Sequence, residues 1–131
     1  MILHDFIGFE RPIPKFFDEG VAQLYEAGKK DQAERLMGKL VKNNQSVPLA
    51  VLRDLDIRKE TDSKKVTIFY AESLSIVDFL IHEYGAGSFA DLCRNLKDGK
   101  SMDDALHGAY TSFLDSLAAL EERWLKYINV F

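Results

Sequence analysis

The spacing of apolar residues between glycine and proline breaks constrains this chain more than any other feature. Apolar side chains recur at intervals of three and four residues, and no segment shows the sustained alternation with period two that a half-buried strand requires. The sequence therefore predicts an all-α fold of about five to seven helices. At 131 residues, the chain fits a single compact domain over residues 1–131.

The predicted helices follow these breaks. We expect helices over about residues 14–28, 30–42, 65–84 and 111–128, a short apolar turn near residues 48–55, and two more helices that begin at the Ser-x-x-Asp sequences of residues 88–91 and 101–104. The helix over 65–84 is the longest and most apolar, so it should be central. Gly28 separates the first two helices, and Trp124 should lie in the core.

Charge and composition exclude several function classes. The net charge of -4 has the wrong sign for a protein that follows a phosphate backbone, so we expect no nucleic-acid partner. We also expect no membrane partner, because there is no signal sequence and no run of 18 apolar residues. The single Cys93 allows no internal disulfide and leaves the cellular location unknown.

General catalytic motifs do not disclose a function. His4, His82 and His107 include no pair at the i, i+4 spacing that lets two imidazoles bind one metal on a helix. For His82 and His107 we favour surface or helix-end positions. The sequence also contains no Ser, His and Asp arrangement, glycine-rich phosphate loop or paired cysteine motif.

The segment IPKFFDEGVAQLYE, residues 13–26, is more specific. It resembles a segment of the peptidase MA-like domain of thermolysin-related zinc metallopeptidases, the gluzincins. Pro14 stands for the family's proline, Phe16 for its usual tryptophan, and residues 18–22 for the core Glu-Gly-hydrophobic-Ala motif. Later matches continue the resemblance over residues 12–128: the Tyr-Ala-x-Ser pattern of residues 70–73, Tyr84-Gly85, and the closing glutamate and tryptophan at Glu121 or Glu122 and Trp124.

The resemblance implies a fold and a set of site residues. The chain should resemble the C-terminal helical subdomain of a gluzincin, a zinc-dependent enzyme that hydrolyses peptide bonds. In an intact relative, Glu19 would be the third zinc ligand and Tyr70 would stabilise the transition state. Two alternatives from the residues alone stay open: Glu19 as a first-turn glutamate favoured by the helix dipole, and Tyr70 as a core tyrosine. Ser73 should pack where two helices cross closely.

One family element is missing. The sequence has no His-Glu-x-x-His motif, which in the family supplies two zinc ligands and the general base. The first residues, MILHDFIGF, resemble the part of that helix just after the second histidine. His4 could be a displaced ligand, but the residues after it resemble a helix tail, which argues against that role. We therefore expect this chain to hold no catalytic zinc and to be inactive alone.

The missing motif leaves a second function open, a non-enzymatic helical protein-interaction module. Its groove would bind a partner peptide or a second copy of the chain. Loss of an upstream segment should leave apolar side chains partly uncovered, and such patches mark interfaces. We therefore expect a homodimer, or contact with a missing N-terminal segment, through Phe6, Phe9, Phe16 and Phe17.

Overall fold

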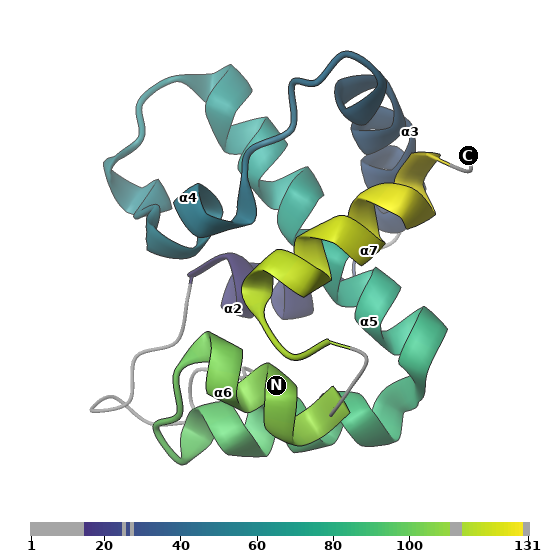
Figure 1. The fold of residues 1–131 in the computed structure, drawn as a ribbon. Coiled ribbons are helices and arrows are strands. Elements are labelled where there is room, and N and C mark those ends of the chain that lie inside the picture. The colour runs from purple at the N-terminus through teal and green to yellow at the C-terminus, as the bar shows by residue number, and fades with distance from the viewer. Residues whose placement is uncertain (1–14, 25, 27, 111–113, 130–131) are drawn as a thin grey trace.

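The structure is a computed structural model of the chain, and it describes residues 15–24, 26, 28–110 and 114–129. These residues form six α-helices and one 3-10 helix, with no strand in the described part of the chain. The elements, labelled as in Figure 1, are α2 (Lys15–Leu24), α3 (Lys29–Lys42), α4 (Leu49–Asp54), η1 (Ile57–Lys59), α5 (Ser63–Lys97), α6 (Met102–Tyr110) and α7 (Leu117–Asn129). The prediction of an all-α fold with five to seven helices is confirmed.

Helix α5 is the central element, and it bends at Gly85 (Figure 1). Gly85 has φ 89° and ψ 162°, a conformation that side-chain-bearing residues rarely adopt, so glycine permits the bend. The predicted break at this glycine is confirmed. The predicted helix start at a Ser88 cap is not observed, however, because α5 continues directly after Gly85.

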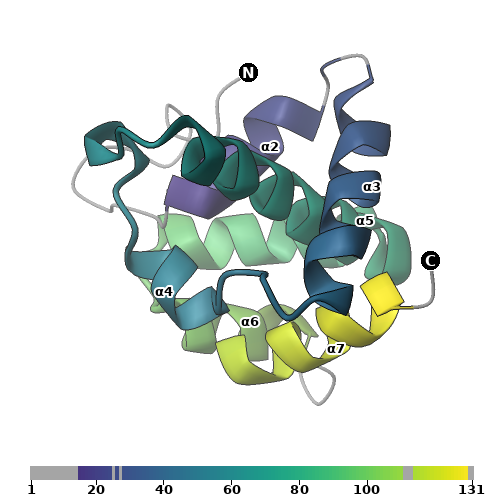
Figure 2. The same cartoon turned by 90° about the horizontal axis from the view of Figure 1, so that it is seen from above.

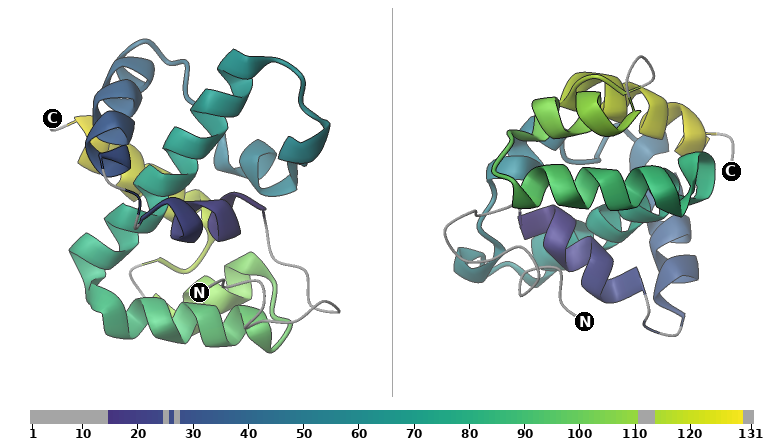
Figure 3. Two further views of the ribbon diagram at one scale, coloured as in Figure 1. Left: turned by 180° about the vertical axis from the view of Figure 1, so that it is seen from behind. Right: turned by 90° about the horizontal axis from the view of Figure 1, so that it is seen from below.

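Helix α2 lies in the angle between the two halves of α5 (Figure 3). Gly20 of α2 faces Ser73 and Val77 in the first half of α5. The ring of Phe17 lies 5.4 Å, between centroids, from the ring of Phe89 in the second half. The bend therefore lets one short helix contact both halves of the long one.

The remaining helices close the core around α5 (Figure 2). Helix α6 packs on the second half of α5, and α7 contacts both α3 and α4. Trp124 of α7 is fully buried, as predicted, and its indole N–H donates a hydrogen bond of 2.9 Å to the Ser75 hydroxyl of α5. Lys30 of α3 forms an ion pair of 3.3 Å with Asp78 of α5.

Two predicted helix starts can be compared with the structure. The Ser-x-x-Asp cap at residues 101–104 is confirmed, since the Asp104 N–H donates to the Ser101 hydroxyl at 3.1 Å. The last helix begins at Leu117, later than the predicted residue 111, and residues 111–113 lie outside the described part. Ser116 caps this helix, because its hydroxyl accepts a hydrogen bond of 3.1 Å from the Ala119 N–H.

The prediction that Phe16 and Phe17 would be partly uncovered was wrong. Their exposed fractions are 0% and 1%, because α2 is packed into the angle of α5. Phe6 and Phe9 lie outside the described residues, so the homodimer stays a prediction without support from Phe16 and Phe17. Within the described residues, no helix combines the length and apolarity needed to cross a bilayer.

Candidate functional site

Helix α2 presents Glu19 beside its buried face. The buried side of this helix consists of Phe16, Phe17, Gly20 and Val21, whereas Glu19 is half-buried. Burial and, secondarily, the neighbouring Asp18 carboxylate raise the pKa of Glu19. No hydrogen bond or ion pair within the described residues engages the Glu19 carboxylate, so it is free to meet a ligand.

Tyr70 lies on the first half of α5. Its phenol is partly buried, and burial followed by the charge of Glu19 raises its pKa. The charge of Glu19 on α2 therefore influences the pKa of Tyr70 on α5. Tyr70 also packs against the core, so its role as a core tyrosine and a role at a site are compatible.

Gly20 and Ser73 set the distance between the two helices. A Cβ atom at Gly20 would lie 2.5 Å from the Ser73 carbonyl oxygen and 2.6 Å from Cγ2 of Val77, closer than real Cβ contacts. The Ser73 hydroxyl turns back along its own helix and donates to the Phe69 carbonyl at 2.6 Å. Ser73 thus packs at a close helix crossing, as predicted, and only glycine fits opposite it.

The described residues do not by themselves fit a catalytic metal. Among them, no three His, Cys, Asp or Glu side chains cluster as a metal site would require. His82 and His107 are exposed and lie on α5 and α6, while His4 lies outside the described residues. Glu19 is a single candidate ligand, and the structure brings no histidine of the described part to it.

Sequence reasoning missed Glu72, which is fully buried. One carboxylate oxygen accepts a hydrogen bond of 2.9 Å from the Val47 N–H, and the other has no hydrogen-bond partner among the described residues. Burial is the main cause that raises the pKa of Glu72 to about 8, and the charge of Glu121 adds to it. The signal was available: Glu72 follows Phe69 by three residues and precedes Ile76 by four, which places it on the apolar stripe.

Glu121 contributes a second carboxylate to the same loop. Its oxygen accepts a hydrogen bond of 3.2 Å from the Leu49 N–H at the start of α4. Glu72 of α5 and Glu121 of α7 therefore hold the segment 47–49 from two sides. This pair is a structural feature, because both carboxylates bond to backbone N–H groups.

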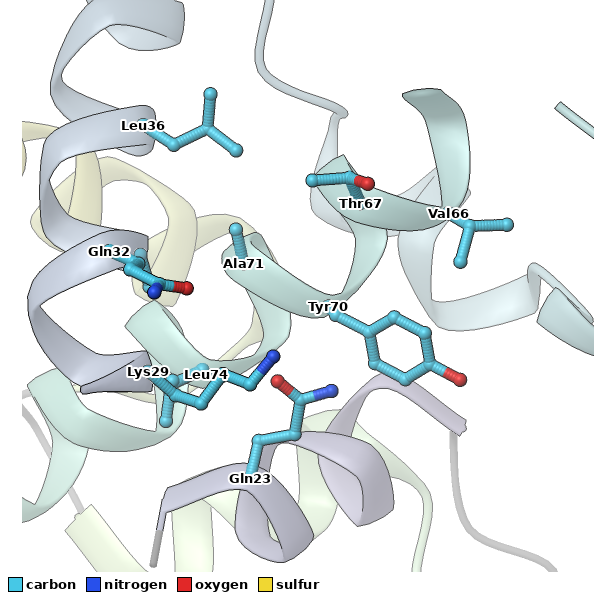
Figure 4. Close-up of a pocket in the computed structure, with 10 residues that line it drawn as sticks. Gln23, Lys29, Gln32, Leu36, Val66, Thr67, Tyr70, Ala71 and Leu74 are labelled. Carbon is cyan, nitrogen blue, oxygen red and sulfur yellow. The ribbon is translucent and has the colours of Figure 1, made fainter. Parts of the chain in front are cut away.

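A pocket opens beside Tyr70, between α2, α3 and α5 (Figure 4). Its volume is about 180 Å³, and Ala33, Ala71 and Leu74 contribute apolar surface. Three polar side chains reach into the space between these helices: those of Gln23, Lys29 and Gln32 (Figure 4). The Tyr70 ring forms one wall of the pocket. The charge of Glu19 contributes to the raised pKa of this tyrosine.

Comparison with known protein families gives one match. The family model of the peptidase MA superfamily matches residues 7–130, nearly the whole sequence. The chain belongs to the peptidase MA superfamily. Comparison with curated proteins and with solved structures found no match.

Family membership confirms the resemblance drawn from the motif of residues 13–26 and from the later helices. The matched range agrees with the predicted range of 12–128 to within a few residues. In this peptidase MA domain, the glycine of the motif, Gly20, lies at the crossing of α2 with α5, and Glu19 precedes it on α2. Membership relates the chain to metallopeptidases, and the individual residue roles belong to the proposal below.

Proposed function

We propose that this peptidase MA domain is the helical part of a zinc peptidase site and is inactive alone. Glu19 is the one metal ligand that it contributes, and Tyr70 is the side chain placed to stabilise a developing negative charge on the substrate. Two histidines and a base glutamate would have to come from a His-Glu-x-x-His segment that this sequence does not contain. The substrate class is a peptide.

The position of Glu19 on the helix that crosses α5 at Gly20, together with its influence on the pKa of Tyr70, supports this proposal. A half-buried carboxylate without a described partner costs free energy when it is ionised. Such a group is typical of a site that binds a cation. Gly20 lets its helix pack closely on Ser73 and Val77 of α5, and the charge of Glu19 contributes to the raised pKa of Tyr70. A first-turn glutamate with only a helix-dipole role would need neither feature.

Metal analysis of the purified chain after exhaustive dialysis tests the missing ligands. We expect zinc far below one equivalent, because one carboxylate is present where a catalytic site needs three ligands. Stoichiometric zinc that is lost in Glu19→Gln and His4→Gln, and kept in Glu122→Gln, would overturn the proposal that the site is incomplete. Glu122 is a suitable control because its side chain is 69% exposed.

A non-enzymatic interaction module is the second candidate, favoured by the absence of His-Glu-x-x-His from the sequence. The coding sequence upstream of Met1 distinguishes the interaction module from the peptidase. A stop codon there would favour the module, which would bind a partner peptide or a second copy. An in-frame His-Glu-x-x-His would favour the peptidase.

If an in-frame His-Glu-x-x-His is found, the protein that includes it would test the roles of the residues directly. We expect Glu19→Gln to lose both zinc and peptidase activity. Tyr70→Phe should keep zinc but lower kcat, since the phenol would act only in the transition state. A Tyr70→Phe variant with unchanged kcat would remove Tyr70 from the proposed site.

A further inference from the structure

We propose that the pocket between α2, α3 and α5 binds a carboxylate group. Tyr70 lines this pocket, and the polar side chains of the pocket suit an anion with hydrogen-bonding oxygens. The carboxylate could belong to an acidic side chain or to a peptide C-terminus. Its use as a substrate subsite rests on the proposed function, whereas the binding itself does not.

Lys29 supplies the charge. It begins α3, and its side chain extends into the pocket toward α5 (Figure 4). In the described part of the chain, no acidic side chain forms an ion pair with Lys29, whereas the next residue, Lys30, is paired with Asp78. Lys29 is thus a cation that is available to an incoming anion.

Gln23 and Gln32 supply hydrogen bonds. Their side-chain amides come from different helices and project toward the same space as the Lys29 ammonium (Figure 4). Amide N–H groups and an ammonium all donate, and an ionised carboxylate only accepts. The two amides can also accept through their oxygens, so it is the Lys29 ammonium, which only donates, that makes the pocket match a carboxylate rather than an ammonium or guanidinium group.

The size and polarity of the pocket limit the ligand further. A cavity of about 150 Å³ accepts a group the size of benzene, so 180 Å³ suits a carboxylate with two or three methylene groups. The buried Ala33 and Leu74 offer those methylenes an apolar surface. The Tyr70 hydroxyl points away from Lys29 (Figure 4), so it leaves the Lys29 end of the pocket open to the anion.

An NMR titration of the ¹⁵N-labelled chain at low ionic strength tests this proposal without metal or activity. Three probes separate the sources: N-acetyl-glutamic acid α-amide for a side-chain carboxylate, N-acetyl-alanine for a C-terminal carboxylate, and N-acetyl-glutamine α-amide as the neutral isostere. We expect at least one carboxylate probe to shift the backbone amides of Gln32, Ala33 and Ala71. It should bind at least tenfold more tightly than the neutral isostere.

Two variants complete the test. Lys29→Gln keeps most of the side-chain length but removes the charge, and it should weaken the carboxylate probe at least tenfold. Lys64→Gln, at an exposed position near the start of α5, should leave the affinity unchanged. Equal binding of the neutral isostere, an unchanged affinity in Lys29→Gln, or no shift at the pocket would overturn the proposal. None of these outcomes depends on zinc, so they are separate from failure of the proposed function.

Discussion

Glu72 lies on α5 with its carboxyl group buried, and the two oxygens of that group have unequal surroundings. One accepts from the Val47 N–H, and the other has no described partner. An ionised carboxylate in such a place costs free energy, and a proton removes most of that cost. The pKa of Glu72 in the native state is therefore about 8, and the neutral form is favoured at any pH below that value.

This raised pKa predicts how stability depends on pH. Below the ordinary glutamate pKa of 4.5, Glu72 is protonated in both the folded and the unfolded chain, and its contribution is fully present. As the pH rises toward 8, only the unfolded chain loses the proton, so the free energy of unfolding falls. Each unit of difference in pKa corresponds to about 1.4 kcal/mol, which gives a loss of a few kcal/mol across this window.

Glu72→Gln should remove this dependence. The amide oxygen can still accept from the Val47 N–H, and no ionisation follows. Urea unfolding between pH 5 and pH 8.5 should show a variant that matches the wild type at low pH and is more stable by a few kcal/mol at high pH. Glu122→Gln, at an exposed position, should follow the wild-type curve. Parallel curves for wild type and Glu72→Gln would show that Glu72 does not govern the slope.

At the scale of elements, the crossing of α2 with α5 depends on the absence of a side chain at Gly20. A methyl group there would collide with a backbone carbonyl oxygen of Ser73 and with the Val77 side chain. Backbone atoms cannot rotate out of the way as a flexible side chain can. The two helices would have to separate, which would also move Glu19 away from Tyr70.

Gly20→Ala should therefore destabilise the protein by roughly 1 to 3 kcal/mol, the usual cost of overpacking. Gly38→Ala is the matched control, because Gly38 lies inside α3 and a methyl group added there would meet no heavy atom within 4 Å. It should stabilise the helix by roughly 0.5 to 1 kcal/mol. Thermal and denaturant melts of both variants measure the difference. A Gly20→Ala protein as stable as Gly38→Ala would contradict the close crossing.

At the scale of the whole molecule, the core and the candidate site should respond differently to truncation. Leu80 of α5 is 1% exposed, and Trp124 of α7 is fully buried with its indole N–H bonded to Ser75. Glu19 is half-buried beside Asp18 and gains no described hydrogen bond. The first two side chains hold helices together, while the third is destabilised by its surroundings.

Leu80→Ala and Trp124→Ala should each cost about 2 to 5 kcal/mol, because they leave cavities in the core. Glu19→Ala should be nearly neutral or slightly stabilising, since it removes a carboxylate that is partly desolvated and lies close to another. Denaturant melts of the three variants give the order. If Glu19→Ala were as damaging as Leu80→Ala, Glu19 would be a structural residue, and the proposed site would lose its main support.

Local features of the sequence determined the helices and the family. The helical spacing of apolar residues predicts an all-α chain because one buried stripe per helix is sufficient to form a core. Gly28 and Gly85 mark breaks that depend only on their own backbone, and both have positive φ in the structure. The motif around Glu19 and Gly20 likewise pointed to the peptidase MA superfamily, since its residues are adjacent in sequence.

Only the tertiary structure decided which distant groups meet. The bend at Gly85 places α2 between the two halves of α5, and this packing buries Phe16 and Phe17, which were predicted to be partly uncovered. Glu72 meets a backbone N–H 25 residues away, and the carboxylate pocket needs side chains from three helices. Periodicity reports which face of a helix is apolar, but the partner of that face depends on the paths of the loops and on the angles at which helices cross.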